Sequence, residues 1–102
     1  MNLTPPASAP IAIAGIPAQA QQRLLEHLAT QPQLQVVWLF GSRAMGRHQP
    51  GSDIDLCLEG PRLSHSDRLL LPWRLDLVLR HELPSDLDAH VQRVGRCVWR
   101  RP

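Results

Sequence analysis

The sequence predicts one small α/β (α+β) domain, built on a mixed β-sheet of about four strands flanked by helices. Short apolar, β-branched runs alternate with stretches in which apolar residues repeat every three to four positions, which gives four helices and four strands in turn. With 102 residues, 43% of them hydrophobic and 20% charged, the chain can bury one modest core.

Composition separates a short N-terminal segment from this domain. Residues 1–14 are rich in proline and alanine without apolar periodicity, so we expect a flexible arm followed by a folded domain over residues 15–102. The segment has neither a basic leader region nor an apolar run long enough for a membrane span. The two cysteines make no disulfide framework, and these features together favour a cytoplasmic protein without membrane contact.

The first part of the domain predicts a helix and then a strand. Pro17 suits the first position of a helix over residues 17–30, and Pro32 stops that helix. Residues 35–40 form a β-branched and aromatic run, which is typical of a buried strand. The apolar stripe of the helix consists of Ala20, Leu24 and Leu28.

Glycine turns connect the next elements. Residues 42–45 predict a short helical turn with Ser42 as its N-cap, and a surface loop follows over residues 47–51. Residues 53–59 alternate between apolar and polar side chains, as a strand with one buried face does. Residues 74–80 predict a third strand that is almost continuously apolar.

Two helices and a last strand complete the expected order. Residues 64–71 are a short helical candidate between the second and third strands, stopped by a proline. Another helix starts within residues 83–86 and ends at Gly95, which suits a C-cap. Residues 97–99 predict a short strand at the edge of the sheet.

A glycine-serine turn and two aspartates are the strongest candidates for chemistry. The turn at Gly41 and Ser42 supplies backbone N–H groups of the kind that bind phosphate. Asp53 and Asp55 are separated by one residue on a strand, so their side chains point to the same face. Two close carboxylates repel each other unless a proton or a cation lies between them, which favours a hard cation. A nucleoside triphosphate with magnesium suits both parts of this pattern.

Asp76 is a third acidic residue, inside an otherwise apolar strand where an unpaired charge is costly. In one interpretation it joins the other two aspartates, so that three carboxylates hold two magnesium ions and Asp76 accepts the proton of an attacking hydroxyl. The alternative is a solvated aspartate at a strand end, or one that is paired with Arg74 or Arg80.

Taken in order, these residues resemble the signature of the polymerase-β-like nucleotidyltransferase superfamily, in which a Gly-Ser turn, ten residues and Asp-x-Asp follow one another. Here the signature is Gly41-Ser42 and then Asp53-Ile54-Asp55. Further matches point to its smallest branch, the minimal nucleotidyltransferases (MNT), and the resemblance extends over roughly residues 17–99. These matches are residues 39–44, Gly46, residues 52–56 and residues 75–78.

The resemblance implies a site for ATP and Mg²⁺, with two ions possible. The residues that it implicates in nucleotide binding are Gly41, Ser42, Arg43 and Ser52. The metal-binding and catalytic residues that it implicates are Asp53, Asp55 and Asp76. For Arg43, a salt bridge on the short helix is the alternative to a phosphate contact.

Members of this branch typically resemble antitoxins that add AMP to a tyrosine of a HEPN-domain ribonuclease toxin. The resemblance therefore implies AMP transfer from ATP to a hydroxyl of such a partner, within a hetero-oligomer. The sequence contains no tyrosine, so a tyrosine acceptor has to belong to the partner. Two alternatives stay open: a catalytically weak module that neutralises a toxin by occlusion, and an antibiotic-modifying nucleotidyltransferase. The second is disfavoured because no separate substrate-binding domain is present.

Several other features are given no catalytic part. A formal net charge of +2 is too small to indicate direct nucleic-acid binding. The connector over residues 60–73 is short for the family, and a shortened helix there would expose apolar surface or weaken the site. The three tryptophans are expected in the core or an interface. Solvated side chains are expected at His27, His48, His65, His81 and His90. A solvated or partner-facing end is expected at Arg93, Arg96, Arg100 and Arg101.

Overall fold

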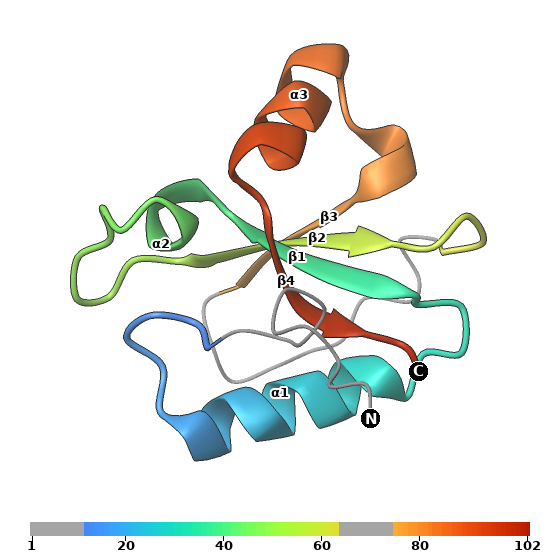
Figure 1. Ribbon diagram of the computed structural model, residues 1–102. Helices are drawn as coiled ribbons and strands as arrows, with labels where there is room; N and C mark the ends of the chain where they lie inside the picture. The colour runs from blue at the N-terminus through green and yellow to red at the C-terminus, as the bar shows by residue number, and fades with distance from the viewer. Residues whose placement is uncertain (1–11, 64–74) are drawn as a thin grey trace, which may run out of the picture.

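The sheet has four strands in the order β3-β2-β1-β4, in a computed structural model that describes residues 12–63 and 75–102 (Figure 1). The strands are β1 (Val36–Phe40), β2 (Ile54–Glu59), β3 (Leu75–Leu79) and β4 (Arg96–Arg100). β1 is antiparallel to both β2 and β4, whereas β2 and β3 are parallel. The predicted mixed sheet of four strands is confirmed, with the last strand at one edge.

Helices lie on both faces of this sheet. The helices are α1 (Ala18–Ala29), α2 (Gly41–Ala44) and α3 (Ser85–Val94), and a 3₁₀ turn, η3 (Arg80–Glu82), precedes α3. In Figure 1, α1 lies below the sheet and α3 above it, while α2 directly follows β1. The turn η3 was not predicted, and the helix predicted over residues 64–71 lies outside the described residues. In the described part of the chain, no helix has the length and apolar character that crossing a bilayer requires.

The larger half of the core lies between α1 and the sheet. Strand side chains alternate between the two faces, so β2 directs its isoleucine and leucines to this side, as predicted. Each fully buried aliphatic side chain contributes about 1.5–3 kcal/mol relative to an exposed one. The buried residues that α1 and the four strands contribute here are Leu24, Leu28, Val37, Leu39, Ile54, Leu56, Leu58, Leu77, Leu79 and Val98.

The smaller half of the core lies under α3. Val91 of α3 packs against Phe40 and Cys57, with Trp38 among the half-buried side chains around them. Burial raises the pKa of the Cys57 thiol to about 12, so the thiol stays protonated at neutral pH and acts as a small apolar side chain. This confirms the apolar role that its strand position predicts.

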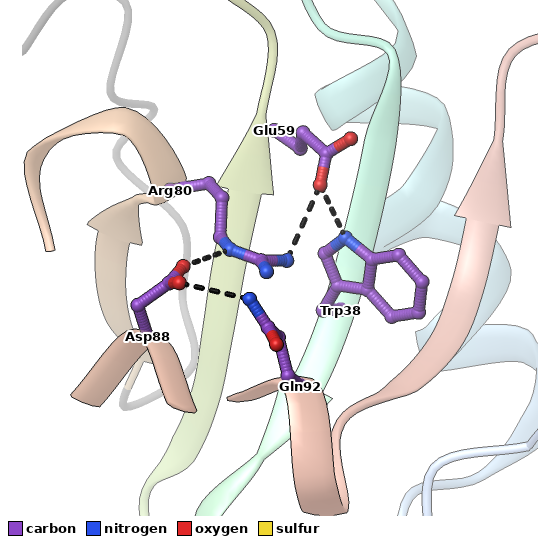
Figure 2. A network of polar contacts seen from close by, with 5 residues as sticks. All are labelled: Trp38, Glu59, Arg80, Asp88 and Gln92. Carbon is purple, nitrogen blue, oxygen red and sulfur yellow. Dashed lines mark hydrogen bonds and ion pairs between the residues drawn. The ribbon is translucent and has the colours of Figure 1, made fainter. Parts of the chain in front are cut away.

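A polar network joins α3 to the sheet on this side (Figure 2). Arg80 of η3 donates from Nε to Asp88 Oδ1 at 2.6 Å, and its Nη1 lies 3.4 Å from Glu59 Oε1. The same Glu59 oxygen accepts a hydrogen bond from Trp38 Nε1 at 2.9 Å, and Gln92 Nε2 donates to Asp88 Oδ2 at 3.0 Å. The start of α3 is therefore tied to β1 and β2, which fixes the helix over the sheet.

The last residues of the predicted arm belong to the packed structure. Ile13 is 1% exposed and lies in the core, and its N–H donates to Gln21 Oε1 of α1 at 2.6 Å. Residues 12–14 are therefore held against the domain. The rest of the predicted arm, residues 1–11, lies outside the described residues.

Arg101 is exposed, as we expected for the C-terminal arginines, but its side chain also makes defined contacts. Its guanidinium donates to the carbonyl oxygens of Leu34 and Gln31, each at 2.8 Å, and of Ala29 at 3.3 Å. It also lies 5.1 Å from the ring centroid of Trp99, a cation–π distance. The side chain thus ties the end of β4 to the C-terminal end of α1. Arg93, Arg96 and Arg100 are exposed as well.

Candidate functional site

The predicted acidic residues meet where β1 ends and β2 and β3 begin. Asp55 is the register partner of Phe40 on β1 and of Asp76 on β3. Asp53 lies one residue before the start of β2. Because β2 and β3 are parallel, Asp55 and Asp76 are neighbours, on the face opposite to the large core cluster.

Asp55 is the central carboxylate of this cluster. It is half-buried, whereas Asp53 and Asp76 are exposed. Burial raises the pKa of Asp55 above its usual value of 3.8, and the negative charges of Asp76 and Asp53 raise it further. Arg43 and His90 act in the opposite direction, with smaller effects on this pKa. The ionised form of Asp55 is therefore held among repelling charges, and a bound cation would relieve that repulsion.

The donor set suits a hard divalent cation such as Mg²⁺, because carboxylate oxygens are its preferred ligands. The three aspartates are not, however, gathered into a closed cage. Among residues 12–63 and 75–102, no group of three or more His, Cys, Asp or Glu side chains is arranged to hold a metal ion. Strand register thus makes Asp55 and Asp76 neighbours. The described residues alone do not surround a metal ion.

Gly41 brings the start of α2 against Asp55. Its φ of +74° lies in the left-handed region, and a Cβ at this position would lie 2.2 Å from Asp55 Oδ2. Only glycine allows this approach. The first N–H groups of a helix have no partner within the helix, so the start of α2 places backbone donors beside a carboxylate. The phosphate-binding role of the Gly-Ser turn stays a prediction.

The two serines of the predicted site have structural contacts of their own. Ser42 is not the N-cap that we predicted: the N-cap is Phe40, which has extended backbone and no side-chain cap hydrogen bond, and Ser42 lies within the helix. The Ser52 hydroxyl accepts a hydrogen bond from the Gln49 N–H at 2.9 Å. The Ser52 N–H donates to the Gln49 carbonyl, also at 2.9 Å, which closes the loop just before Asp53.

Arg43 makes contacts that differ from both sequence interpretations. The side chain is 8% exposed, and it donates to the carbonyl oxygens of Ala14 at 2.6 Å and Ser52 at 2.8 Å. Its Nε is buried and has no hydrogen-bond partner within the part of the chain described. The guanidinium therefore joins α2 to the N-terminal segment and to the loop before β2. From this position Arg43 lowers the pKa of Asp55, and the phosphate contact that the resemblance implies stays a prediction.

Two histidines are not the solvated side chains that we expected. His90 is half-buried on α3, and its ring meets that of Phe40 edge-on at 6.1 Å, close enough to Asp55 to lower its pKa. His48 is half-buried too, and its Nδ1 has no hydrogen-bond partner among the described residues. His90 is the site residue that sequence reasoning missed, and only its place on the inward face of an amphipathic helix could have indicated it.

The alternative partners of Asp76 were Arg74 and Arg80. Arg80 is engaged with Asp88 and Glu59 in the network described above. Arg74 lies outside the described residues. Asp76 is exposed on the edge strand β3, which accounts for an acidic residue in an otherwise apolar run.

The raised pKa of Asp55 predicts that Asp55→Asn stabilises the metal-free protein near neutral pH. A carboxyl whose pKa is higher in the folded state stabilises the fold at low pH, and this contribution is lost as the pH rises through the folded-state pKa. The gain from Asp55→Asn should therefore grow with pH above about 4 and reach no more than about 1 kcal/mol, because Asp55 is partly solvated. Urea unfolding of both proteins between pH 4 and 8 measures this difference.

With Mg²⁺ present, the wild type should become more stable than Asp55→Asn. Mg²⁺ that binds the folded wild type raises its unfolding midpoint by mass action, and the variant should gain much less. If Asp55→Asn and the wild type have the same free energy of unfolding at every pH, burial and charge repulsion do not destabilise the ionised Asp55, and the prediction fails.

Comparisons with known proteins point in the same direction as the site. A family model described as "Polymerase beta, Nucleotidyltransferase" matches residues 22–102. No curated protein matches the chain. The match covers all four strands and the three aspartates, which lie within its range.

Solved structures with similar chains include toxin–antitoxin complexes. One is a toxin–antitoxin structure with AMP-PNP, with a TM-score of 0.67 and 25% identity over 79% of this chain and 73% of that one. A structure of tri-AMPylated Shewanella oneidensis HEPN toxin in complex with MNT antitoxin gives a TM-score of 0.62 and 22% identity, over 81% of this chain and 71% of that one. A Sulfolobus solfataricus protein described as a candidate nucleotidyltransferase gives a TM-score of 0.53 and 22% identity, over 86% of this chain and 93% of that one. At 22% identity, the last two similarities show that those chains and this one have the same fold.

Proposed function

This chain belongs to the polymerase beta nucleotidyltransferase family, and on that premise we propose that it transfers AMP from ATP, with Mg²⁺, to a tyrosine hydroxyl of a HEPN-domain partner protein. The observation that carries the proposal is the contact between Gly41 and Asp55. It puts a phosphate-binding turn beside a carboxylate that has Asp76 as its register partner. The similar antitoxin chains, among them one in a structure with AMP-PNP and one beside an AMPylated toxin, support the substrate and the partner.

In this proposal the chain mainly positions the reactants. The backbone N–H groups of Gly41 and Ser42 hold the triphosphate for in-line attack. The three aspartates would hold Mg²⁺, which would supply positive charge against the triphosphate and the pyrophosphate leaving group. The acceptor oxygen forms a bond to the α-phosphorus as the bond from that phosphorus to the α,β-bridging oxygen breaks. Asp76, exposed at the sheet edge, takes the proton of the acceptor hydroxyl.

The acceptor has to come from outside the chain if it is a tyrosine, since the sequence has none. Asp53 and Asp76 are exposed, so the acidic cluster is open to a side chain of another protein. A 102-residue domain forms at most a shallow pocket around it. A protein acceptor suits this open site better than a small molecule, which needs an enclosing pocket.

A second candidate is a module that keeps the fold and binds its partner without turnover. It is favoured by the connector over residues 60–73, which is short for the family. In that case toxin neutralisation works by occlusion, and the aspartates contribute little.

Transfer of label from α-labelled ATP distinguishes the two candidates. The wild type is incubated with Mg²⁺ and a HEPN-domain protein, and compared with Asp53→Ala/Asp55→Ala and with Glu26→Ala/Asp86→Ala, two exposed acidic residues outside the site. We expect labelled partner with the wild type and the control, and a loss of at least about 1,000-fold in the aspartate variant. A partner with phenylalanine in place of the acceptor tyrosine should stay unlabelled. Tight binding without label would overturn transfer and leave occlusion.

A further inference from the structure

A second cleft lies on the other flank of β1 from the aspartates. Its volume is about 690 Å³, and it runs between α2 and the junction of α3 with β4. Leu39 of β1 and Arg96 of β4 line it, whereas Asp55 and Asp76 lie on β2 and β3. The strand order places β2 and β4 on opposite sides of β1, so the two sites are separate and share α2 as a common wall.

Charge in this cleft is of one sign. Every ionisable side chain among its described lining residues is an arginine, and Arg47, Arg93 and Arg96 are exposed. None of these three pairs with a carboxylate within the described part of the chain. Clustered like charges repel, and guanidinium groups bind carboxylates with two parallel hydrogen bonds. The cleft is therefore complementary to a ligand with several carboxylates.

Apolar surface lies between these arginines. Met45 is the exposed large hydrophobic residue of the described chain, at 41% exposure, and the half-buried Val94 lines the same cleft, with the buried Leu39 beneath. Methionine and arginine are enriched in protein interfaces, and the flexible thioether adapts to a partner's shape. A nucleic-acid backbone would use the charge but not this apolar floor, so the mixture favours a protein segment.

We propose that this arginine cleft, lined by Arg47, Arg93, Arg96, Met45, Val94 and Leu39, docks an acidic segment of the protein that carries the acceptor hydroxyl. The segment presents carboxylates to the arginines and apolar side chains to the floor. Because α2 borders both the cleft and the phosphate-binding turn, docking here holds the partner next to the nucleotide. The identity of the partner rests on the proposed function, whereas the cleft and its charge do not.

The test measures affinity and transfer separately. Arg93→Glu/Arg96→Glu reverses two exposed charges of the cleft, and the matched control Arg23→Glu/Arg62→Glu reverses two exposed charges elsewhere. Binding to the same HEPN-domain protein is measured by calorimetry at low and high salt. We expect the dissociation constant to rise at least about tenfold in the cleft variant at low salt, and less at high salt, because screening weakens charge pairs. The control should change less than about twofold.

Two further measurements separate the possible outcomes. Affinity for AMP-PNP with Mg²⁺ should be the same in all three proteins, which shows that the cleft variant is folded and keeps its nucleotide site. Equal partner affinity in the cleft variant and the wild type, or no binding of that partner by the wild type, would overturn the proposal. A 12-nucleotide uridine RNA that displaces the partner from the cleft would also overturn it, in favour of nucleic acid. If binding depends on the cleft but no label is transferred, the proposed AMP transfer is wrong and the docking proposal stands.

Discussion

Replacing Gly41 by alanine is expected to lower label transfer at least about 100-fold, because a displacement of about 1 Å in a reacting group can cost this much. The added Cβ would lie 2.2 Å from Asp55 Oδ2 and 3.0 Å from its Cγ. The Asp55 side chain can rotate away at small cost in stability, but its carboxylate then leaves the phosphate-binding turn. The main stability cost comes from a φ of +74°, about 1–2 kcal/mol for a residue with a side chain.

Gly51→Ala is the matched control for this prediction. Gly51 has a φ of +85°, and a Cβ there would meet nothing within 4 Å. Both variants should therefore lose a similar free energy of unfolding, whereas only Gly41→Ala should lose most of its activity. Equal losses of activity would show that backbone strain, and not the contact with Asp55, governs the site.

Replacing Arg43 by methionine should destabilise the fold by about 2–4 kcal/mol, out of a total of about 5–15 kcal/mol for a small domain. The change removes two hydrogen bonds from a charged, buried group and leaves the carbonyls of Ala14 and Ser52 without their donor. Arg43→Lys should recover little, because an ammonium group cannot reproduce the fork that reaches both carbonyls. Guanidinium chloride unfolding measures each variant.

Arg47→Met provides the comparison, since Arg47 is an exposed neighbour on the same turn. It should change the free energy of unfolding by less than about 0.5 kcal/mol. If Arg43→Met unfolds like the wild type but binds AMP-PNP weakly, the contacts with Ala14 and Ser52 are dispensable. The phosphate contact implied by family resemblance would then be the correct role for Arg43.

The sequence was sufficient for the features that depend on local spacing. Period-two alternation along residues 53–59 predicts that Ile54, Leu56 and Leu58 face the large core. The run from Leu75 to Leu79 is long enough to be a strand on its own. Gly41, the first residue of α2, is predicted by the turn that it has to make. The structure keeps these features because each depends only on residues a few positions apart in the sequence.

The missed features depend on contacts between distant residues. Arg43 meets Ala14, 29 positions earlier, and nothing near Arg43 in the sequence indicates that partner. His90 reaches Asp55 only because α3 packs over β1 and β2, held by Arg80 and Glu59. Ser42 has the residue type of a cap, but the preceding strand runs straight into the helix and leaves Phe40 at the cap position. Tertiary packing decides all three.

The position of β4 has a consequence for synthesis on the ribosome. β1 pairs on one edge with β2, which follows soon after it in the sequence, and on the other edge with β4, which is made last. Arg101 is also made late, and the carbonyl groups that it binds lie 67 to 72 residues earlier. A nascent chain that has emerged only as far as β3 still lacks Val98 and exposes the β4-facing edge of β1. Such an edge recruits strands from other chains. We therefore expect this domain to complete its sheet late in translation and to rely on rapid closure by its last strand.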